Sequence, residues 1–179
     1  MILGIPTWVG GTPSSTPAAV KDFRVGGVVF WVDPLDNTHG LVCAIEDQSS
    51  GIQWYNGSNT TTGATGTVIG LGSTNTTAII ANQGLVETSY AAGLARDYDG
   101  GGYTDWFLPS KDELNEMYQN KATINTTATA NSGADFSNIY YWSSTEYDSD
   151  RAWLQYFANG GQYDNVKGNT NNVRAVRAF

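Results

Sequence analysis

Three carboxylates near the C-terminus are the first side chains whose spacing suggests chemistry. Glu146, Asp148 and Asp150 lie within five consecutive positions, and Ca²⁺ in proteins is bound by carboxylate oxygens of this kind. The segment lacks the Asp-x-Asp-x-Asp-Gly spacing of a complete calcium loop. Asp97 and Asp99 precede a run of three glycines, in a stretch typical of a turn that ends a helix. We therefore expect neither a metal site nor a cofactor.

Nucleophilic catalysis would need a nucleophile beside a base, and the chain offers no convincing pair. Cys43, the single cysteine, lies in the apolar run 41–45, and the only histidine, His39, stands four residues earlier in a predicted turn. One cysteine can form neither an internal disulfide nor a thiolate metal cluster, so Cys43 is expected to be a small buried residue. The glycine-rich stretch 63–70 lacks the Gly-Lys-Ser/Thr ending of a phosphate-binding loop. We expect no enzymatic activity.

Tyrosines with small polar neighbours give the C-terminal third the residue types of a recognition surface. Asn, Asp and Gly stand close to Tyr156 and Tyr163. An exposed tyrosine offers a large contact area, a polar tip and few rotatable bonds, and the small polar residues adapt their hydrogen bonds to a ligand. We expect both tyrosines to be exposed; an ordinary polar loop is the alternative.

Composition limits the classes of protein to which the chain can belong. Its 179 residues carry 9 Lys and Arg against 17 Asp and Glu, a net charge of −8, whereas binding a nucleic-acid backbone needs clustered cations. Docking on anionic membranes needs them too. No run approaches the ~18 apolar residues of a membrane span, and residues 1–6 lack the features of a signal peptide. Few charges (15%) and many aromatic residues (12%) favour a packed, loop-rich domain over disorder.

The hydrophobic pattern predicts strands first and helices next. β-branched and aromatic residues over 25–32 and 41–46 predict a hairpin, and residues 52–55 predict a third, short strand. Apolar residues at the 3.6-residue period predict one helix over 74–96. A second helix is predicted to begin after Ser110, whose side chain forms a capping box with the glutamate three positions on.

Strands return in the last part of the chain, with candidates over 140–142, 152–157 and 173–179. This order of elements predicts an α+β fold. The odd spacing of Arg174 and Arg177 places them on opposite faces of the last strand. One is therefore expected to pair with a buried acid or with the backbone, and the other to reach solvent.

The N-terminal segment differs in composition from the rest. Residues 1–22 are rich in Pro, Thr, Ser and Gly, which predicts an extended arm or linker, and residues 23–179 are predicted to form one domain. Ile5 and Trp8 are apolar enough to dock on a neighbouring subunit, so a homo-oligomer is an open alternative to a monomer.

Three separated motifs resemble the C-terminal domain family of collagen-like bacterial adhesins. They are GGGYTDWFLPSKDEL at 100–114, YWSSTEY at 141–147 and NVRAVRAF at 172–179, in that order. Residues 27–33 and 40–42 are similar to that family too, so the resemblance extends over nearly the whole domain.

That family is similar in fold to C-type lectin proteins of the formylglycine-generating-enzyme type. The resemblance implies a loop-rich α+β domain of C-type lectin fold, with two helices and small twisted antiparallel sheets. The enzymes of that type use a pair of cysteines, which Cys43 alone does not supply. Neither Glu-Pro-Asn nor Trp-Asn-Asp, the triplets with which lectins bind sugars through calcium, occurs in the chain.

Some members of the family are variable proteins of diversity-generating retroelements, such as phage tropism determinants that bind host receptors. In these proteins a C-terminal segment is rewritten at adenine positions of its coding template, and Asn codons are the richest targets. The resemblance implies a variable-type segment at about 143–172. Its changeable positions, each of a type that adenine changes reach from an Asn codon, are the candidate ligand-binding residues: Asp148, Asp150, Arg151, Leu154, Tyr156, Ala158, Gly160, Tyr163, Asp164, Val166 and Gly168.

The frame around these positions is expected to be buried. Burial of Trp142, Trp153, Phe157 and Val176 would contribute about 1.5–3 kcal/mol for each medium-sized apolar side chain.

The acidic side chains of the segment favour a neutral or basic ligand over an anionic one. The resemblance implies a receptor-recognition protein at a virion surface, or outside or on a cell, that binds a protein or glycan. A structural or assembly module of an adhesin or viral fibre, without a diversified site, is the alternative.

Overall fold

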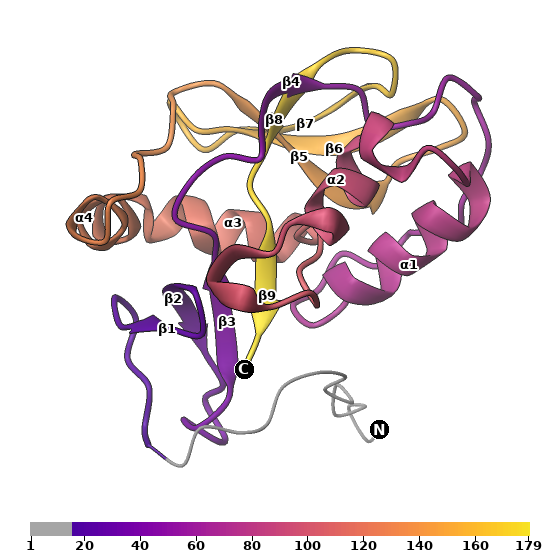
Figure 1. The fold of residues 1–179 in the computed structure, drawn as a ribbon. Coiled ribbons are helices and arrows are strands. Elements are labelled where there is room, and N and C mark those ends of the chain that lie inside the picture. The colour runs from indigo at the N-terminus through magenta and orange to yellow at the C-terminus, as the bar shows by residue number, and fades with distance from the viewer. Residues whose placement is uncertain (1–15) are drawn as a thin grey trace.

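The computed structural model describes residues 16–179 and shows two small β-sheets packed with helices (Figure 1). This architecture confirms the predicted α+β class. Residues 1–15 of the predicted arm lie outside the described residues. The elements follow in this chain order: β1 (Phe23–Arg24), β2 (Gly27–Val32), β3 (Gly40–Cys43), β4 (Ser49–Ile52), α1 (Gly72–Gln83), the 3-10 turn η1 (Glu87–Ser89), α2 (Ala91–Asp97), the 3-10 turn η2 (Gly100–Gly102), α3 (Lys111–Gln119), α4 (Lys121–Ala130), β5 (Tyr140–Glu146), β6 (Arg151–Tyr156), β7 (Gln162–Val166), β8 (Asn171–Val173) and β9 (Val176–Ala178).

The first sheet has the order β1-β2-β3-β9, and every neighbouring pair is antiparallel. Its centre is the predicted hairpin, in which Val28 of β2 pairs with Cys43 of β3. Because side chains alternate between the faces of a strand, Val28 and Val29 enter two different buried clusters. Cys43 is fully buried, as expected, and burial raises the pKa of its thiol to about 12.

The second sheet has the order β4-β8-β5-β6-β7, and β5 with β8 is its parallel pair. In Figure 1 it lies at the top, with α1 and α3 beneath it. Trp142 of β5 enters one buried cluster and its neighbour Tyr141 enters the other. Each sheet therefore contributes side chains to both clusters.

The final strand predicted over 173–179 is wrong as a single element. β8 ends at Val173 in the second sheet and β9 begins at Val176 in the first, so the chain crosses between the sheets here. The crossing buries both arginines: Arg174 is 1% and Arg177 is 4% exposed. The expectation that one of them reaches solvent is therefore also wrong, because each guanidinium contacts its own carboxylate.

The helical region differs from the predicted pair of helices. The helix predicted over 74–96 is two helices, since α1 ends at Gln83 and the next residue, Gly84, has a φ of +67°, which glycine adopts without steric cost. α2 then begins at Ala91. No prediction covers α4, because its Thr- and Ala-rich sequence offers only Ile124 as a large apolar side chain. Within the described residues the scaffold thus has four α-helices rather than two.

The predicted capping box is confirmed at the start of α3. The Ser110 hydroxyl accepts a hydrogen bond from the Glu113 N–H (3.3 Å), and the Glu113 carboxylate accepts one from the Ser110 N–H (2.7 Å). The same carboxylate accepts a hydrogen bond from the Gly70 N–H (2.8 Å). Because Glu113 is fully buried, it joins the long glycine-rich loop to the start of α3.

Glu113 should make stability depend on pH. Burial raises the pKa of its carboxyl from 4.5 to about 7, although neighbouring N–H donors oppose the shift. The folded protein binds this proton more tightly than the unfolded chain does. The protonated Glu113 carboxyl therefore stabilises the fold fully below about pH 4.5. This stabilisation is lost as the pH rises toward 7, by at most about 1.4 kcal/mol per pH unit.

Urea unfolding of the wild type and of Glu113→Gln, between about pH 5 and 8, measures this dependence. As the pH rises, we expect the free energy of unfolding of the wild type to fall relative to that of the variant. A difference that stays constant over this range would contradict the assignment.

Candidate functional site

A hollow lined by tyrosines opens on the second sheet. Its volume is about 270 Å³, and its lining comes from β5, β6 and β7: Tyr140, Leu154, Tyr163, Asp164 and Asn165. Tyr140 and Tyr163 are 41% and 47% exposed, whereas Leu154 is 2% exposed. We call this feature the tyrosine hollow; exposed rings form its sides and a buried aliphatic side chain forms its floor.

Strand register brings the tyrosines together. Tyr140 of β5 pairs with Tyr156 of β6, and Leu154 of β6 pairs with Tyr163 of β7, so all four side chains lie on one face. The rings of Tyr140 and Tyr156 stack with centroids 4.5 Å apart, and Tyr163 meets Tyr140 edge-on at 6.4 Å. Contacts of this kind contribute about 0.5–1.5 kcal/mol each. Tyr163 is exposed as expected, but Tyr156 is half-buried because Tyr140 covers it.

The rim of the tyrosine hollow supplies hydrogen-bonding groups. Asp164 lines the hollow, but its side chain alternates to the opposite face of β7. There its carboxylate accepts a hydrogen bond from Arg151 (2.9 Å), and this bond raises the pKa of the Arg151 guanidinium. The Asn165 side-chain oxygen accepts a hydrogen bond from the Val166 N–H (2.9 Å). The arrangement can stack against a ligand and hydrogen-bond to it, while the rigid rings lose little conformational freedom.

The candidate ligand-binding positions are spread over both faces of the β6–β7 pair and the turns around it. Leu154, Tyr156 and Tyr163 lie on the face of the tyrosine hollow. Arg151 and Val166 pair with each other across the two strands, and the alternation of side chains places them on the opposite face. A ligand that fills the hollow therefore contacts only part of the set.

The other candidates lie in turns. Asp148 and Asp150 occupy the turn between β5 and β6, where the Asp148 carboxylate accepts hydrogen bonds from the N–H groups of Asp150 (3.0 Å) and Arg151 (2.8 Å). Ala158 is exposed in the turn between β6 and β7, and Gly168 follows β7. The turn geometry thus accounts for Asp148 without a metal ion.

Two of the candidate positions are constrained by the fold. Gly160 has a φ of +81°, and an added Cβ would lie 2.3 Å from the ring of Tyr118, so other residues are strained there. Leu154 is packed in a buried cluster that also contains Trp142. A substitution at Gly160 or Leu154 therefore disturbs packing before it changes a ligand contact.

Tyr140 and Asn165 are the two lining residues that the candidate set lacks, and Tyr140 is the one that lies outside the variable-type segment. It precedes the variable-type segment, and the strand predicted over 140–142 gave it no role of its own. The usable signal is alternation, because Tyr140 is exposed while its neighbour Tyr141 is fully buried. Its contact with Tyr163 depends on the pairing of three strands, which no local pattern contains.

The predicted frame is confirmed for three of its four residues. Trp142, Phe157 and Val176 are at most 1% exposed. Trp153 is only partly buried, and the Lys111 ammonium lies 3.4 Å from the centre of its ring. A cation over an indole ring is a favourable contact, so Lys111 covers the part of Trp153 that the core does not.

Glu146 does not belong to an exposed acidic cluster. Its side chain is buried, and its carboxylate accepts hydrogen bonds from the Lys167 ammonium (2.6 Å) and from the N–H groups of Thr62 (2.9 Å) and Gly63 (3.1 Å). Within residues 16–179 no group of three His, Cys, Asp or Glu side chains could hold a metal ion. The acids of the C-terminal segment therefore do not form one surface.

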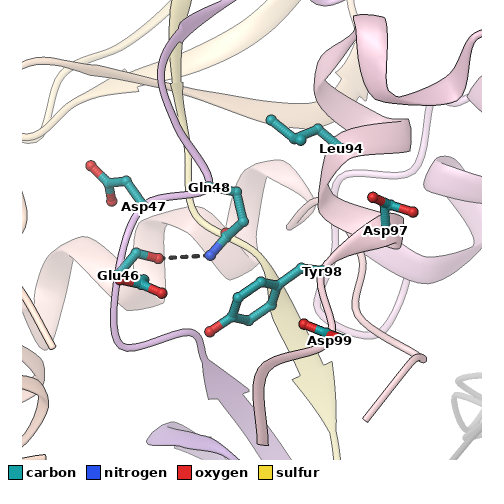
Figure 2. A pocket seen from close by; sticks show the side chains of 7 residues that line it. All are labelled: Glu46, Asp47, Gln48, Leu94, Asp97, Tyr98 and Asp99. Atoms are coloured by element: carbon teal, nitrogen blue, oxygen red, sulfur yellow. Dashed lines mark hydrogen bonds between the residues drawn. The ribbon is translucent and has the colours of Figure 1, made fainter. Parts of the chain in front are cut away.

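A second hollow, of about 410 Å³, lies between the segment after β3 and the end of α2 (Figure 2). Its lining is mostly acidic and polar: Glu46, Asp47, Gln48, Leu94, Asp97, Tyr98 and Asp99. The Asp47 carboxylate is already engaged inside the protein, since it accepts hydrogen bonds from Arg174 (2.6 Å) and Asn172 (2.9 Å). Burial, followed by the charge of Glu46, raises the pKa of the Tyr98 hydroxyl. This hollow is therefore an acidic depression beside a structural ion pair.

Comparisons with known proteins place these observations in a family. A family model described as the Lcl C-terminal domain matches residues 43–177, and no curated protein matches the chain. A solved fimbrial protein from Bacteroides ovatus ATCC 8483 is similar to it, with a TM-score of 0.62 and 16% identity. The match covers 84% of this chain and 43% of that one, so the chain spans less than half of the neighbour's length. In the part of the chain that the structure describes, the helices are too short or too polar to cross a bilayer.

Proposed function

Because the chain belongs to the Lcl C-terminal domain family, we propose that it is an adhesin-like recognition module at a cell or virion surface, with its ligand bound in the tyrosine hollow. The solved neighbour supports the proposal, since it shares the fold and is described as a fimbrial protein. The partners of the whole protein are part of this proposal.

The observation that carries the proposal is the pair of exposed rings, Tyr140 and Tyr163, above the buried Leu154. Exposed apolar surface with a polar rim marks interaction sites on proteins, and tyrosine is enriched among the residues that dominate binding energy. Because three paired strands hold the rings, little side-chain freedom remains to be lost on binding.

The ligand class follows from the charge around the hollow. Asp164 belongs to the lining, and the whole chain has a net charge of −8. Asp148 and Asp150 lie in the turn at the other end of the β5–β6 pair. Glu146 no longer contributes, because its charge is buried against Lys167. A protein or glycan that is neutral or basic suits this surface, and a strongly anionic ligand would contradict the proposal.

The proposal extends to how the site arose: the chain is a variable protein of a diversity-generating retroelement, and the exposed candidate positions around β6 and β7 are its diversified residues. The test is the DNA beside the gene, which should contain a near-identical template repeat and a reverse transcriptase gene. If both are missing, diversification is wrong and the binding proposal is unaffected.

Replacing Tyr140 and Tyr163 together by alanine should weaken ligand binding by at least about 10-fold, because an aromatic hot-spot residue contributes about 2 kcal/mol or more. Ligands are selected with the wild type from a glycan array and from a phage-displayed peptide library, and are then titrated against the variants. The variant should still unfold cooperatively, with a midpoint of thermal unfolding lowered by no more than about 10 °C, because the two ring contacts that it loses contribute about 0.5–1.5 kcal/mol each.

Tyr147→Ala is the matched control, since Tyr147 is 52% exposed and does not line the hollow; it should bind as the wild type does. Unfolding of the double variant would mean that the tyrosines are structural. A wild type that selects no ligand and forms a fixed oligomer would favour the alternative of an assembly module.

A further inference from the structure

The tyrosine hollow ends at the free edge of the second sheet. Among the strands of residues 16–179, β7 is the last of this sheet and pairs with β6 alone. We infer that an extended segment of a partner protein adds to the sheet beside β7 and places one of its side chains in the tyrosine hollow. The inference rests on the proposed function, since it names the ligand class of the same hollow. In strand addition, main-chain hydrogen bonds provide affinity and a side-chain pocket provides specificity.

The register of β7 decides which backbone groups are open. In an antiparallel pair, alternate residues direct their N–H and C=O groups toward the partner strand. The Lys167 N–H donates to the Asp150 C=O (2.9 Å), and the Tyr156 N–H donates to the Gly161 C=O (2.8 Å). The odd-numbered residues of β7 therefore face β6. The even-numbered residues direct these groups to the side where no further described strand pairs.

Two of the three outward-facing residues remain available to a partner. Val166 is already bonded, since its N–H donates to the Asn165 side chain (2.9 Å) and its C=O accepts from the Asn169 N–H (3.0 Å). Gln162 and Asp164 are left, two positions apart. This is the spacing at which one strand hydrogen-bonds to the next.

The other described sheet edges are less suited to a partner strand. β1 is only two residues long. β9 is bridged on its outer side, where Phe107 and Val176 exchange two backbone hydrogen bonds (both 2.9 Å). The register of β4 is broken between Ser49 and Ile52. Because regular, unpaired edges promote strand addition, β7 is the described edge at which we expect it.

The hollow and the edge are continuous. Tyr163, Asp164 and Asn165 belong to β7 and also line the hollow. An added strand would lie about 4.8 Å from β7, and its residue opposite Tyr163 would direct its side chain to the face of the rings. The hollow, of about 270 Å³, has room for one aliphatic or aromatic side chain.

Charge defines the partner strand further. Asp164 lies on the β7 edge itself. Asp148 and Asp150 lie in the turn beside the C-terminal end of β7, where the Asp150 C=O accepts from the Lys167 N–H (2.9 Å). The nearby cation Arg151 is paired with Asp164 (2.9 Å). Complementary charge steers encounter and suppresses wrong partners. The expected partner strand therefore carries one apolar side chain flanked by lysine or arginine.

Amide hydrogen exchange, followed by NMR on the 179-residue chain, tests the backbone contacts. In the free protein the N–H groups of Gln162 and Asp164 should exchange at least about 10-fold faster than those of Tyr163 and Asn165, which bond to β6. The probe is a peptide that the chain selects from a phage-displayed random library. When bound, it should slow exchange at Gln162 and Asp164 only. Protection of both groups in the free protein, as when a second copy covers the edge, or unchanged exchange with bound peptide would overturn the inference.

Substitution at the edge tests the same contacts by affinity. Asp164→Pro removes an outward N–H, and proline is tolerated where the N–H of an edge strand faces solvent. Peptide binding should weaken about 5- to 10-fold, as expected for one net backbone hydrogen bond. Asp164→Asn keeps the N–H and removes the charge, so it should lose only the preference for basic peptides. N-methylation of alternate peptide residues should weaken binding as much as Asp164→Pro does. Because it leaves the protein unchanged, this measurement tests the same contacts even if the Asp164→Pro variant folds poorly.

The two proposals fail in distinguishable ways. If the Tyr140 and Tyr163 double variant loses its ligand while Asp164→Pro and N-methylation have no effect, strand addition is wrong and the hollow still binds. Selection of glycans alone leads to the same conclusion. If the double variant binds every selected ligand as the wild type does, the hollow is not the site and both proposals fall.

Discussion

Replacing Lys167 by methionine should lower the free energy of unfolding by about 3–5 kcal/mol, because the change leaves a buried carboxylate without its cation. Lys167 is 0% and Glu146 is 4% exposed. The ammonium donates to the Glu146 carboxylate (2.6 Å) and to the C=O groups of Thr60 and Ser149 (both 2.9 Å). It also lies 4.7 Å from the centre of the Trp54 ring. One ammonium group thus joins the loop after β4, the β5–β6 turn and the end of β7.

Urea unfolding followed by tryptophan fluorescence measures the loss. Asp164→Ala is the matched control, because it breaks the partly exposed pair of Arg151 and Asp164 (2.9 Å) and should cost less than about 1 kcal/mol. Combining Lys167→Met with Glu146→Leu should recover part of the loss, since an apolar pair has no unpaired buried charge. A loss below about 1 kcal/mol for Lys167→Met alone would contradict the role of the buried pair.

Replacing Arg174 by methionine should cost a similar 3–5 kcal/mol, roughly. Its guanidinium donates to the Asp47 carboxylate (2.6 Å) and to the Ala134 C=O (3.1 Å). It also stacks on Phe136, with 4.0 Å between the guanidinium carbon and the ring centre. Arg174 is 1% exposed and the Asp47 side chain is 18% exposed, so the variant leaves a mostly buried carboxylate with neutral donors only.

Arg174→Lys should lose an intermediate amount, because lysine keeps the charge but not the planar fork that serves several acceptors at once. Arg151→Met is the control, since its side chain is 49% exposed, and it should change stability by less than about 1 kcal/mol. An Arg174→Lys variant as stable as the wild type would show that charge alone matters at this position.

The sequence analysis succeeds where neighbours along the chain do the bonding. The β2–β3 hairpin and the capping box of Ser110 and Glu113 are both local, and both are confirmed. The break in the predicted helix 74–96 was harder to foresee, because a single glycine inside a helical pattern costs only about 1 kcal/mol. Gly84 ends the helix through its left-handed φ, which the pattern of apolar residues does not reveal.

The lining of the tyrosine hollow was predicted by residue type better than by position, and its role in binding stays a proposal. Tyr163 is exposed and lines the hollow, and chemistry alone had singled it out. Tyr140 was missed and Tyr156 is half-buried, because both depend on how β5 and β6 pair. Strand pairing decides which residue stacks on which, and a shift by one position would move every side chain to the other face.

Local patterns of residue type were enough to predict the α+β class, the burial of Cys43, the cap of α3 and the exposure of Tyr163. Which charges are buried depends on how distant segments pack. The Glu146 carboxylate meets a backbone N–H that lies 84 positions away along the chain, and Arg174 meets its carboxylate across 127 positions. The physical reason is that local periodicity specifies which face of an element turns inward, whereas the neighbours found there depend on how distant strands pack. The acidic side chains that the sequence analysis assigned to one surface are therefore divided: Glu146 is in a buried ion pair, Asp164 is paired with Arg151, and Asp148 and Asp150 lie in a turn.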